Sequence, residues 1–585
     1  MVFGKNVTHY YFKYFHLLLI GIMALIFVDY IQLLIPENYG YLIDLIKDKA
    51  LTNDLLMKIV LDVTFIALGM FAGRFAWRIT VLNMGVNVET DLRRKMFLHM
   101  ESLAQEYFQQ HKTGAQMALY TNDIMAIKNC FTDGVIMAID ALFLGGLAIY
   151  KMIRLNPLMT IVASVPLLII GLCGGILGKM IDRKFERRQK SYERLSEFAQ
   201  ENFSGIAVIK AFVKEKLEYI QFAKLNREYS KHNIAFTKLI LVMNVMFAAL
   251  INIIIVIVIG YGTYLIQSTA GTEQPFTSGD LVVFISYFGS LTWPALALAN
   301  LINIIAQGRT SLRRINELLN YPVTVMDGPD VLVDASVEGD IAFQHLTFTY
   351  PGTEQPVLKD VSFVIQKGEK VGIIGKTGCG KTTLADLLVR MYNVEPGMIT
   401  IGGKDIMRLP IRKVRESIAY VPQDNFLFNQ SVLENIAFSR KYMTKEEASY
   451  FAQLAHVDDN IQEFKDGYDT MIGERGVTLS GGQKQRISMA RAMAKSADVL
   501  ILDDAVSAVD TKTEAGILHT LQTEFANKTI ILIAHRVSTI QHLDKILLID
   551  EGKVVAYGTH EELYRTTPMY KDIVELQKLE EGDQE

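Results

Sequence analysis

One glycine-rich run in the second half of the chain has the residue types that hold a triphosphate. The phosphate-loop pattern G-x-x-x-x-G-K-[S/T] is matched at every required position by Gly375, Lys376, Thr377, Gly378, Cys379, Gly380, Lys381 and Thr382. Glycines let such a loop curl until successive N–H groups face one phosphate, and the following helix N-terminus adds partial positive charge. We expect Lys381 to reach the β- and γ-phosphates, the Thr382 hydroxyl to bind Mg²⁺, and the adjacent Thr383 to contact the nucleotide. A chance glycine-rich turn is the alternative.

A second group of chemically active residues ends an apolar run. Residues 499–502 predict a buried strand that ends in two carboxylates, Asp503 and Asp504. The first suits the coordination shell of Mg²⁺, directly or through water, and the second is placed to orient or deprotonate an attacking water. The apolar run 371–374 predicts the strand that feeds the phosphate loop, and 382–392 predicts the helix that leaves it.

A glycine pair between these two groups offers another place for phosphate. A helix is expected to begin near Lys484, and its N–H groups would form a second phosphate-binding end. The residues just ahead of that helix are Ser480, Gly481, Gly482 and Gln483. On its own the glycine pair is weak evidence, because many turns contain one.

Three single residues complete the set of candidates. Gln423 follows a β-like run and is a candidate ligand for Mg²⁺ or water. His535 follows the predicted strand 529–533, where its imidazole could hydrogen-bond a γ-phosphate. Tyr350 precedes a Pro-Gly turn and offers a ring on which adenine could stack. Taken singly, each is also an ordinary strand-end or turn residue.

Composition bounds the class of protein. The chain has 585 residues, enough for several domains, and half of them are apolar while 21% are charged. The mean hydropathy of +0.21 indicates a mixture of membrane and soluble parts. The net charge of −4 gives no reason to expect nucleic acid as a partner. Cys130, Cys173 and Cys379 have neither metal-ligand nor disulfide spacing, which fits a reducing compartment.

Apolar runs long enough to cross about 30 Å of hydrocarbon are concentrated in the first 305 residues. We place six spans, at 15–35, 59–79, 135–153, 158–181, 239–266 and 281–305. The long polar segments after the second and fourth spans keep a helical spacing of apolar residues, so we expect two helical hairpins. The segment 182–238 is rich in Lys and Arg, which places it, and with it the N-terminus, in the cytoplasm.

The pattern changes beyond residue 320. Short β-branched runs alternate with helical segments, which is typical of an α/β domain with a largely parallel sheet. The expected architecture is therefore an all-α polytopic membrane domain fused to an α/β phosphate-loop domain. We expect the membrane domain at 1–320, a linker at 321–338 and the nucleotide-binding domain at 339–585.

Taken together, these motifs resemble the ATP-binding-cassette family, in that family's order along the whole chain. The membrane half resembles a six-helix exporter domain, with Pro36, Gly40 and Asp44 after the first span and Gly279-Asp280 before the sixth. The run 473–476 is similar to a short loop of exporters. The resemblance implies an ATPase coupled to transport that binds ATP and Mg²⁺. The expected ligands of Mg²⁺ are Thr382, Gln423 and Asp503.

The family architecture also implies a second chain of the same kind. Two cassettes would close head to tail, so that residues 480–483 contact ATP held mainly by the partner, with Asp510 in the adjoining loop. The tips of the two inner hairpins would pass force to the cassettes. We place these tips near 120–125, including Asp123, and 208–213, with Phe212 as the side chain that enters a cassette groove.

One departure from the family pattern bears on activity. The residue after the magnesium aspartate is usually Glu and here is Asp504, one methylene shorter. A misplacement of about 1 Å can cost about 100-fold in rate, so we expect a weak hydrolytic site. A compensating shift of the backbone is the alternative. The combination resembles the degenerate-site subunit of heterodimeric bacterial multidrug exporters, although His535 is retained where some such subunits have lost it.

Polar and aromatic residues inside the spans are candidates for the substrate path: Asp29, Asp140, Phe288 and Trp293. A structural acid pair is an equally good interpretation of Asp29 and Asp140. The predicted function is ATP-driven efflux of amphipathic small molecules across a bacterial cytoplasmic membrane, as half of a heterodimer. The alternatives are a homodimeric exporter of lipid or peptide, and an ATP-gated membrane regulator.

Overall fold

The computed structural model describes residues 4–273, 275–473, 476 and 478–582, without the side chains of residues 165–179 and 580–582. The chain divides into two compact units. The first contains Met1–Leu98 and Met117–Asn320, and the second contains His99–Gln116 and Tyr321–Glu585. Each unit is described by itself below. Glu474 and Arg475 of the expected exporter loop lie outside the described residues.

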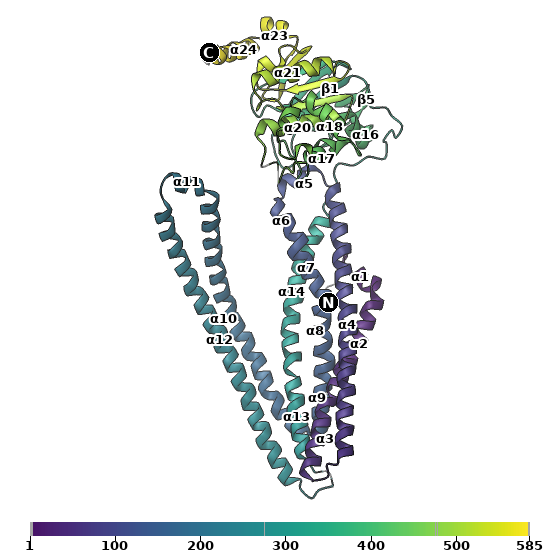
Figure 1. The fold of residues 1–585 in the computed structure, drawn as a ribbon, viewed down its shortest axis with the longest axis vertical. Coiled ribbons are helices and arrows are strands. Elements are labelled where there is room, and N and C mark those ends of the chain that lie inside the picture. The colour runs from purple at the N-terminus through teal and green to yellow at the C-terminus, as the bar shows by residue number, and fades with distance from the viewer. Residues whose placement is uncertain (1–3, 274, 474–475, 477, 583–585) are drawn as a thin grey trace. The chain divides into compact units, whose positions relative to one another are not determined.

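The first unit is helical (Figure 1). Its helices are α1 (Thr8–Lys13), α2 (Phe15–Gln32), α3 (Leu34–Lys47), α4 (Asn53–Ser102, whose end belongs to the second unit), α7 (Ile124–Phe131), α8 (Asp133–Ile139), α9 (Gly145–Leu155), α10 (Pro157–Ser204), α11 (Ile206–Ala211), α12 (Glu215–Ser268), α13 (Ser278–Ser290) and α14 (Thr292–Leu319). Two π-helical turns, η1 (Leu119–Asp123) and η2 (Asp140–Leu144), interrupt the third apolar segment. The long helices α10 and α12 pack side by side, with α11 at the tip of their hairpin.

Five helical segments of the described chain are long and apolar enough to cross a membrane: Phe15–Lys47, Asn53–Ser102, Thr113–Leu155, Glu215–Ser268 and Ser278–Leu319. Each contains one of the predicted spans. The fourth predicted span, 158–181, falls inside α10, and most of its side chains lie outside the described part. The count of six spans therefore stays a prediction.

Two sequence features that were noted separately meet in the first unit. The Asp44 carboxylate on α3 accepts hydrogen bonds from the Gly279 N–H, at 2.8 Å, and from the Thr277 hydroxyl, at 2.7 Å. A Cβ on Gly279 would lie 2.3 Å from the Gly40 carbonyl oxygen, so only glycine allows this close approach. The motif after the first span and the motif at the start of α13 are thus two sides of one helix contact.

The second unit contains two sheets. One has the strand order β2-β1-β4-β5 and is antiparallel; its strands are β1 (Ile341–Phe348), β2 (Leu358–Ile365), β4 (Ile399–Ile401) and β5 (Lys404–Asp405). The other has the order β10-β9-β3-β8-β7-β6 and is parallel except for β10. Its strands are β3 (Lys370–Ile374), β6 (Ile418–Val421), β7 (Val499–Asp503), β8 (Thr529–Ile533), β9 (Lys545–Asp550) and β10 (Lys553–Gly558). This confirms the expected α/β fold.

Helices cover the sheets. They include α5 (Gln105–Gln110), α15 (Lys381–Leu388), α16 (Ile411–Ser417), α17 (Val432–Ile436), α18 (Lys445–Leu454), α19 (Asp458–Gln462), α20 (Gly481–Ala494), α21 (Thr511–Thr523), α22 (Val537–Ile540), α23 (His560–Thr566) and α24 (Pro568–Gly582), with α6 (Thr113–Ala118) spanning the division between the units.

The predictions of two helix bounds were wrong. The helix after the phosphate loop ends at Leu388, not Tyr392, because Arg390 adopts the left-handed φ of +51°. The helix after the glycine pair begins at Gly481, not Lys484, because Ser480 caps it.

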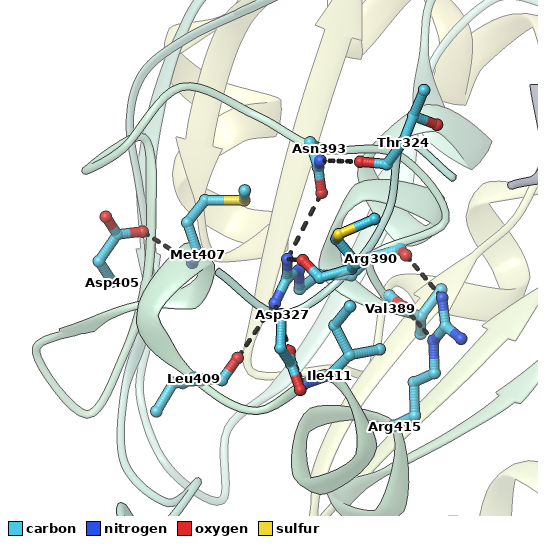
Figure 2. Close-up of polar contacts among 11 residues, drawn as sticks. Thr324, Asp327, Val389, Arg390, Asn393, Asp405, Met407, Leu409, Ile411 and Arg415 are labelled. Atoms are coloured by element: carbon cyan, nitrogen blue, oxygen red, sulfur yellow. Dashed lines mark hydrogen bonds and ion pairs between the residues drawn. The ribbon is translucent and has the colours of Figure 1, made fainter. Parts of the chain in front are cut away.

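The segment 321–338 lies in the second unit, where a buried arginine holds part of it (Figure 2). Arg390 is 1% exposed and donates to the carbonyls of Leu409, at 3.0 Å, and Met326, at 3.5 Å. Its guanidinium also pairs with Asp327, at 3.6 Å, and the Asp327 carboxylate accepts the Ile411 N–H. Arg390, two residues beyond the end of α15, thus holds this segment against the α/β fold of the second unit.

Candidate nucleotide site

The phosphate loop has the conformation that its glycines predict. Strand β3 ends at Ile374, and α15 begins at Lys381, with Gly378 and Gly380 at φ of +82° and +105°. The buried Lys381 ammonium donates to the loop carbonyls of Gly375, at 2.8 Å, and Lys376, at 2.9 Å. These two bonds keep the ammonium inside the loop, where it could turn to a phosphate oxygen.

The predicted residues surround one cavity of about 270 Å³. Its lining comes from both sheets and from the ends of four strands: Tyr350, Val357, Thr377, Gly378, Gly380, Lys381, Thr382, Thr383, Gln423, Asp503, Asp504 and His535. All but Val357 were singled out from the sequence. The edge of a parallel sheet explains this convergence, because β3, β7 and β8 run in the same direction and their carboxyl ends meet.

Asp503 has the environment of a metal ligand. It is 1% exposed, and among the described residues its Oδ2 has no hydrogen-bond partner. Burial and then the neighbouring negative charge of Asp504 raise the pKa of Asp503, while a hydrogen bond with Thr382 lowers it. Thr382 and Gln423 share the same cavity. An unsatisfied buried carboxylate beside a hydroxyl and an amide is a donor set that fits Mg²⁺.

Asp504 is held by its backbone. Its N–H donates to the Ile533 carbonyl at 2.9 Å, and its carbonyl accepts from Gln485 Nε2, at 3.1 Å, and Ser507 Oγ, at 3.0 Å. Its φ of +51° is in the left-handed region, which Asp tolerates better than most residues. Gln485 also accepts the Ala508 N–H, so it joins this residue to the following loop. The sequence pattern did not single out Gln485, because a helical glutamine carries no local signal of such a role.

Tyr350 lies at the mouth of the phosphate loop. Its hydroxyl is 2.9 Å from Thr383 Oγ1, and its ring meets Phe348 and Tyr392 edge to face. Burial raises the pKa of Tyr350. The ring is thus fixed by two aromatic neighbours, which suits a stacking surface. Tyr392 was not among the sequence candidates.

The backbone around His535 is hydrogen-bonded to the last helix, α24. Gln577 on α24 donates through Nε2 to the His535 carbonyl, at 2.8 Å, and accepts the Val537 N–H at 2.7 Å. One amide therefore spans the loop that carries His535 into the cavity. Sequence reasoning missed Gln577, since nothing local distinguishes it from other glutamines on an amphipathic helix.

The glycine pair does not line this chain's own cavity. Ser480 caps α20 by accepting the Gln483 N–H at 3.3 Å, and Gln483 Oε1 accepts the Ser480 N–H at 2.9 Å. Gly481 follows Ser480 at the exposed start of this helix, while Gly482 packs close to the Ala508 carbonyl. Asp510 caps α21 in the same way, and the hydrogen bonds from Thr513 lower the pKa of Asp510. These N-termini lie open on the fold.

The predicted coupling residues have different environments. Phe212 lies at the end of α11 and is 68% exposed, as expected of a side chain that enters a groove elsewhere. Asp123 is buried within the first unit, where it accepts the Ser311 hydroxyl at 2.6 Å and pairs with Arg314 at 3.0 Å. These contacts hold the Asp123 side chain between η1 and α14, and its coupling role stays a prediction.

The part of the first inner hairpin that joins the second unit is α5. Tyr107 on α5 packs against Tyr321, with ring centroids 4.8 Å apart, and Gln109 hydrogen-bonds Tyr392. The contact therefore reaches the aromatic residues around Tyr350.

The predicted substrate-path residues are all in the first unit. Asp29 is 4% exposed and Asp140 is 7% exposed, whereas Trp293 is 47% exposed and donates its indole N–H to Asp140 Oδ2 at 2.6 Å. Phe288 is 4% exposed and belongs to the apolar core of α13 and its neighbours, which favours a packing role.

Known proteins share both halves of this architecture. The family described as the ABC transporter transmembrane region matches residues 18–295, and the family described as ABC transporter matches residues 358–507. The probable multidrug resistance ABC transporter ATP-binding/permease protein YheI of Bacillus subtilis is 33% identical over 582 residues, covering 99% of this chain and 98% of that protein.

Two further relatives extend the comparison. The multidrug resistance-like ATP-binding protein MdlA of Escherichia coli is 31% identical over 561 residues, covering 96% of this chain and 94% of that protein. The solved structure of a bacterial Atm1-family ABC exporter with ATP bound has a TM-score of 0.74 at 25% identity, covering 96% of this chain and 98% of that one.

Proposed function

Because the chain belongs to the ATP-binding-cassette transporter family, as an ATPase coupled to transmembrane transport, we propose that it is one half of a heterodimeric multidrug exporter with a weak ATP site of its own. Its cargo would be amphipathic small molecules, a proposal supported by the names of the relatives in Bacillus subtilis and Escherichia coli. The membrane domain would be 1–320, the linker 321–338 and the ATPase domain 339–585.

The proposed binding step uses residues of the phosphate loop. ATP would stack on Tyr350, and Lys381 would exchange the carbonyls of Gly375 and Lys376 for the β- and γ-phosphates. Thr382, Gln423 and Asp503 would hold Mg²⁺, which neutralises phosphate charge when bound. His535 would donate a hydrogen bond to the γ-phosphate from the loop that Gln577 fastens.

The weakness of the hydrolytic step rests on the backbone of Asp504, and this is the observation that carries the proposal. A shift towards the phosphate would have to break the bonds to Ile533, Gln485 and Ser507. The main chain is therefore poorly able to make up for the missing methylene, and the carboxylate would orient the attacking water badly. ATP would bind in this site and turn over slowly.

The exposed start of α20, with its glycine pair, supports the part of the proposal that concerns the partner's ATP site. Ser480 and the first turn of α20 do not line this chain's cavity, and the partial positive charge of a helix N-terminus suits a phosphate. They would complete the site on the partner, and hydrolysis would occur there. The basic segment 182–238 supports a cytoplasmic position of the ATPase domain at a bacterial inner membrane.

The test compares the chain alone with the chain plus its partner. We expect slow ATP turnover by the chain alone, faster turnover by the pair, and a further rise of about tenfold at this site for Asp504→Glu. ATP-dependent uptake of an amphipathic dye into inverted vesicles would separate an exporter from an ATP-gated regulator. Robust turnover by the chain alone, unchanged in Asp504→Glu, would contradict the weak-site proposal.

A further inference from the structure

Two carboxylates are buried in the first unit, and each has one oxygen without a hydrogen-bond partner among the side chains that the structure describes. Asp29 lies on α2, and Asp140 is the first residue of the π-helical turn η2, which packs against α2. Among the described residues, Asp29 Oδ2 and Asp140 Oδ1 have no hydrogen-bond partner, and the two residues lie on elements that pack against each other. Buried acceptors in this state are costly, so such a pair calls for a cation or donor from elsewhere.

Trp293 fixes the geometry of Asp140. The indole N–H donates to Asp140 Oδ2 at 2.6 Å, which leaves Oδ1 as the open oxygen. The Trp293 side chain is nearly half exposed, so its ring also offers a free aromatic surface beside the acid pair. A negative group next to an aromatic face attracts an organic cation in two ways, by charge and by the ring quadrupole.

The backbone around the pair departs from regular α-helix at two places. The π-helical turn begins at Asp140, and the helix pair α13 and α14 breaks at Leu291, just before Trp293. A Cβ on Gly145 would lie only 3.2 Å from Pro294, so these two irregular segments pack closely. π-Helical turns are frequent at functional sites because the extra residue redirects side chains.

We propose that Asp29 and Asp140 bind the protonated amine of an amphipathic cargo, whose aromatic body lies on Trp293. The inference rests on the proposed exporter function and names the substrate class. An ammonium has N–H donors for both open oxygens. A divalent metal would need more ligands, and the described residues contain no group of three or more His, Cys, Asp or Glu side chains that could hold one.

The chain offers a direct readout, because Trp77 and Trp293 are its only tryptophans. Dansylcadaverine carries a primary ammonium, and its dansyl group accepts fluorescence energy from an indole. The binding measurement uses the full chain with Trp77→Phe in lipid nanodiscs without ATP. We expect saturable energy transfer from Trp293 to this amine. In Asp29→Asn and in Asp140→Asn, the dissociation constant for the amine should rise by about tenfold or more. N-hexyl dansylamide, which lacks the ammonium, should show no such loss.

Asp133→Asn is the matched control, since Asp133 is exposed at the start of α8 in the same helical segment. It should bind the amine like the parent. Retained thermal midpoint and ATP affinity in Asp29→Asn and Asp140→Asn show that these variants fold. Unchanged amine affinity in both variants, or equal binding of the neutral dansylamide, would overturn the inference and leave the two acids as a packing pair.

The two proposals fail separately. Amine binding that depends on Asp29 and Asp140, without ATP-driven uptake into vesicles, would contradict the exporter and keep the site. Uptake of dansylcadaverine with the same half-saturating concentration in the parent and in both Asn variants would contradict the site and keep the exporter.

Discussion

Burial raises the pKa of two carboxyls near the phosphate loop. Asp503 at the end of β7 is almost fully buried, and its pKa is raised. Asp386 on α15 is partly buried, and desolvation together with the charge of Asp503 raises its pKa to about 6. Two acids close together in a partly dry site repel each other, so this repulsion destabilises the folded cassette near Asp503.

Asp386 provides a test of this cost with a definite sign. Its folded pKa of about 6 lies above the usual 3.8, so the folded chain binds a proton more tightly than the unfolded chain. The free energy of unfolding therefore falls as pH rises from about 4 to 6, by at most about 3 kcal/mol. Asp386→Asn should raise the thermal midpoint of the nucleotide-free full chain at pH 7.5, and this gain should shrink as pH falls below 6.

Glu395→Gln is the control for lost charge, because Glu395 is an exposed carboxyl near the same helix. Its thermal midpoint should follow that of the parent at both pH values. A gain for Asp386→Asn that is equally large at pH 5 and pH 7.5 would mean that burial does not set the charge of this group.

At the scale of elements, α24 positions a loop of the ATP site. Gln577 holds both the His535 carbonyl and the Val537 N–H. Removing it with Gln577→Ala should lower ATP affinity about fivefold, from a hydrogen-bond contribution of about 1 kcal/mol. ADP affinity should stay the same, because the loop would act on the γ-phosphate alone. Equilibrium binding of the two nucleotides to the full chain measures this difference.

Gln577→Glu separates the two bonds of that side chain. The carboxylate can still accept the Val537 N–H but cannot donate to the His535 carbonyl, so discrimination between ATP and ADP should be lost in part. Leu576→Ala changes an exposed neighbour on the same helix and should have no effect. Equal losses of ATP and ADP affinity in Gln577→Ala would indicate a general destabilisation of the cassette.

The segment 321–338 depends on one buried side chain in a comparable way (Figure 2). In Arg390→Met, the carbonyls of Leu409 and Met326 lose their donor and Asp327 loses its ion pair. Leaving such groups unsatisfied costs about 1–3 kcal/mol. We expect proteolytic cleavage within 321–338 to become about tenfold faster as this segment opens locally.

Arg412→Ala removes an arginine that is 89% exposed and pairs with Glu416 in its own helix, so its cleavage rate should match that of the parent. If Arg390→Met is cleaved at the parent's rate within 321–338 and elsewhere faster, Arg390 stabilises the cassette core and does not fasten the linker.

These elements show what the sequence could predict. Glycine spacing and apolar runs are local, so they identified the phosphate loop, the strand ending at Asp503 and eleven of the twelve residues that line the cavity. Gln577, Gln485 and Arg390 act through partners far along the chain, which no local pattern encodes. The end of α15 was misplaced for the same reason, because Arg390 leaves the helix to reach the linker.

At the scale of the whole molecule, the proposal is an assembly with two unequal ATP sites. In this proposal the chain would supply the shortened carboxylate of Asp504 to its own site and the start of α20 to the other site. Substitutions should therefore act asymmetrically. Disrupting Ser480 should abolish most ATP turnover by the assembled pair. Disrupting Lys381 should leave a larger fraction of that turnover.

A cysteine already in the phosphate loop turns this asymmetry into a test of the partner's identity. If two copies of this chain paired head to tail, Ser480→Cys would face Cys379 of the other copy across bound ATP. Cys379 is 5% exposed and burial raises the pKa of its thiol, so oxidation would be slow but feasible over hours. We expect no disulfide-linked pair of this chain in a Cys130→Ser, Cys173→Ser background with Ser480→Cys and ATP, when copper phenanthroline and air are added as the oxidant.

With a partner chain that carries an introduced cysteine in its own phosphate loop, the same variant should form an ATP-dependent heterodimer on a non-reducing gel. Removing Cys379 by Cys379→Ser must leave that product unchanged, since the partner supplies the second thiol. A crosslinked pair of this chain alone that disappears in Cys379→Ser would establish a homodimer, and both ATP sites would then carry the same aspartate at position 504.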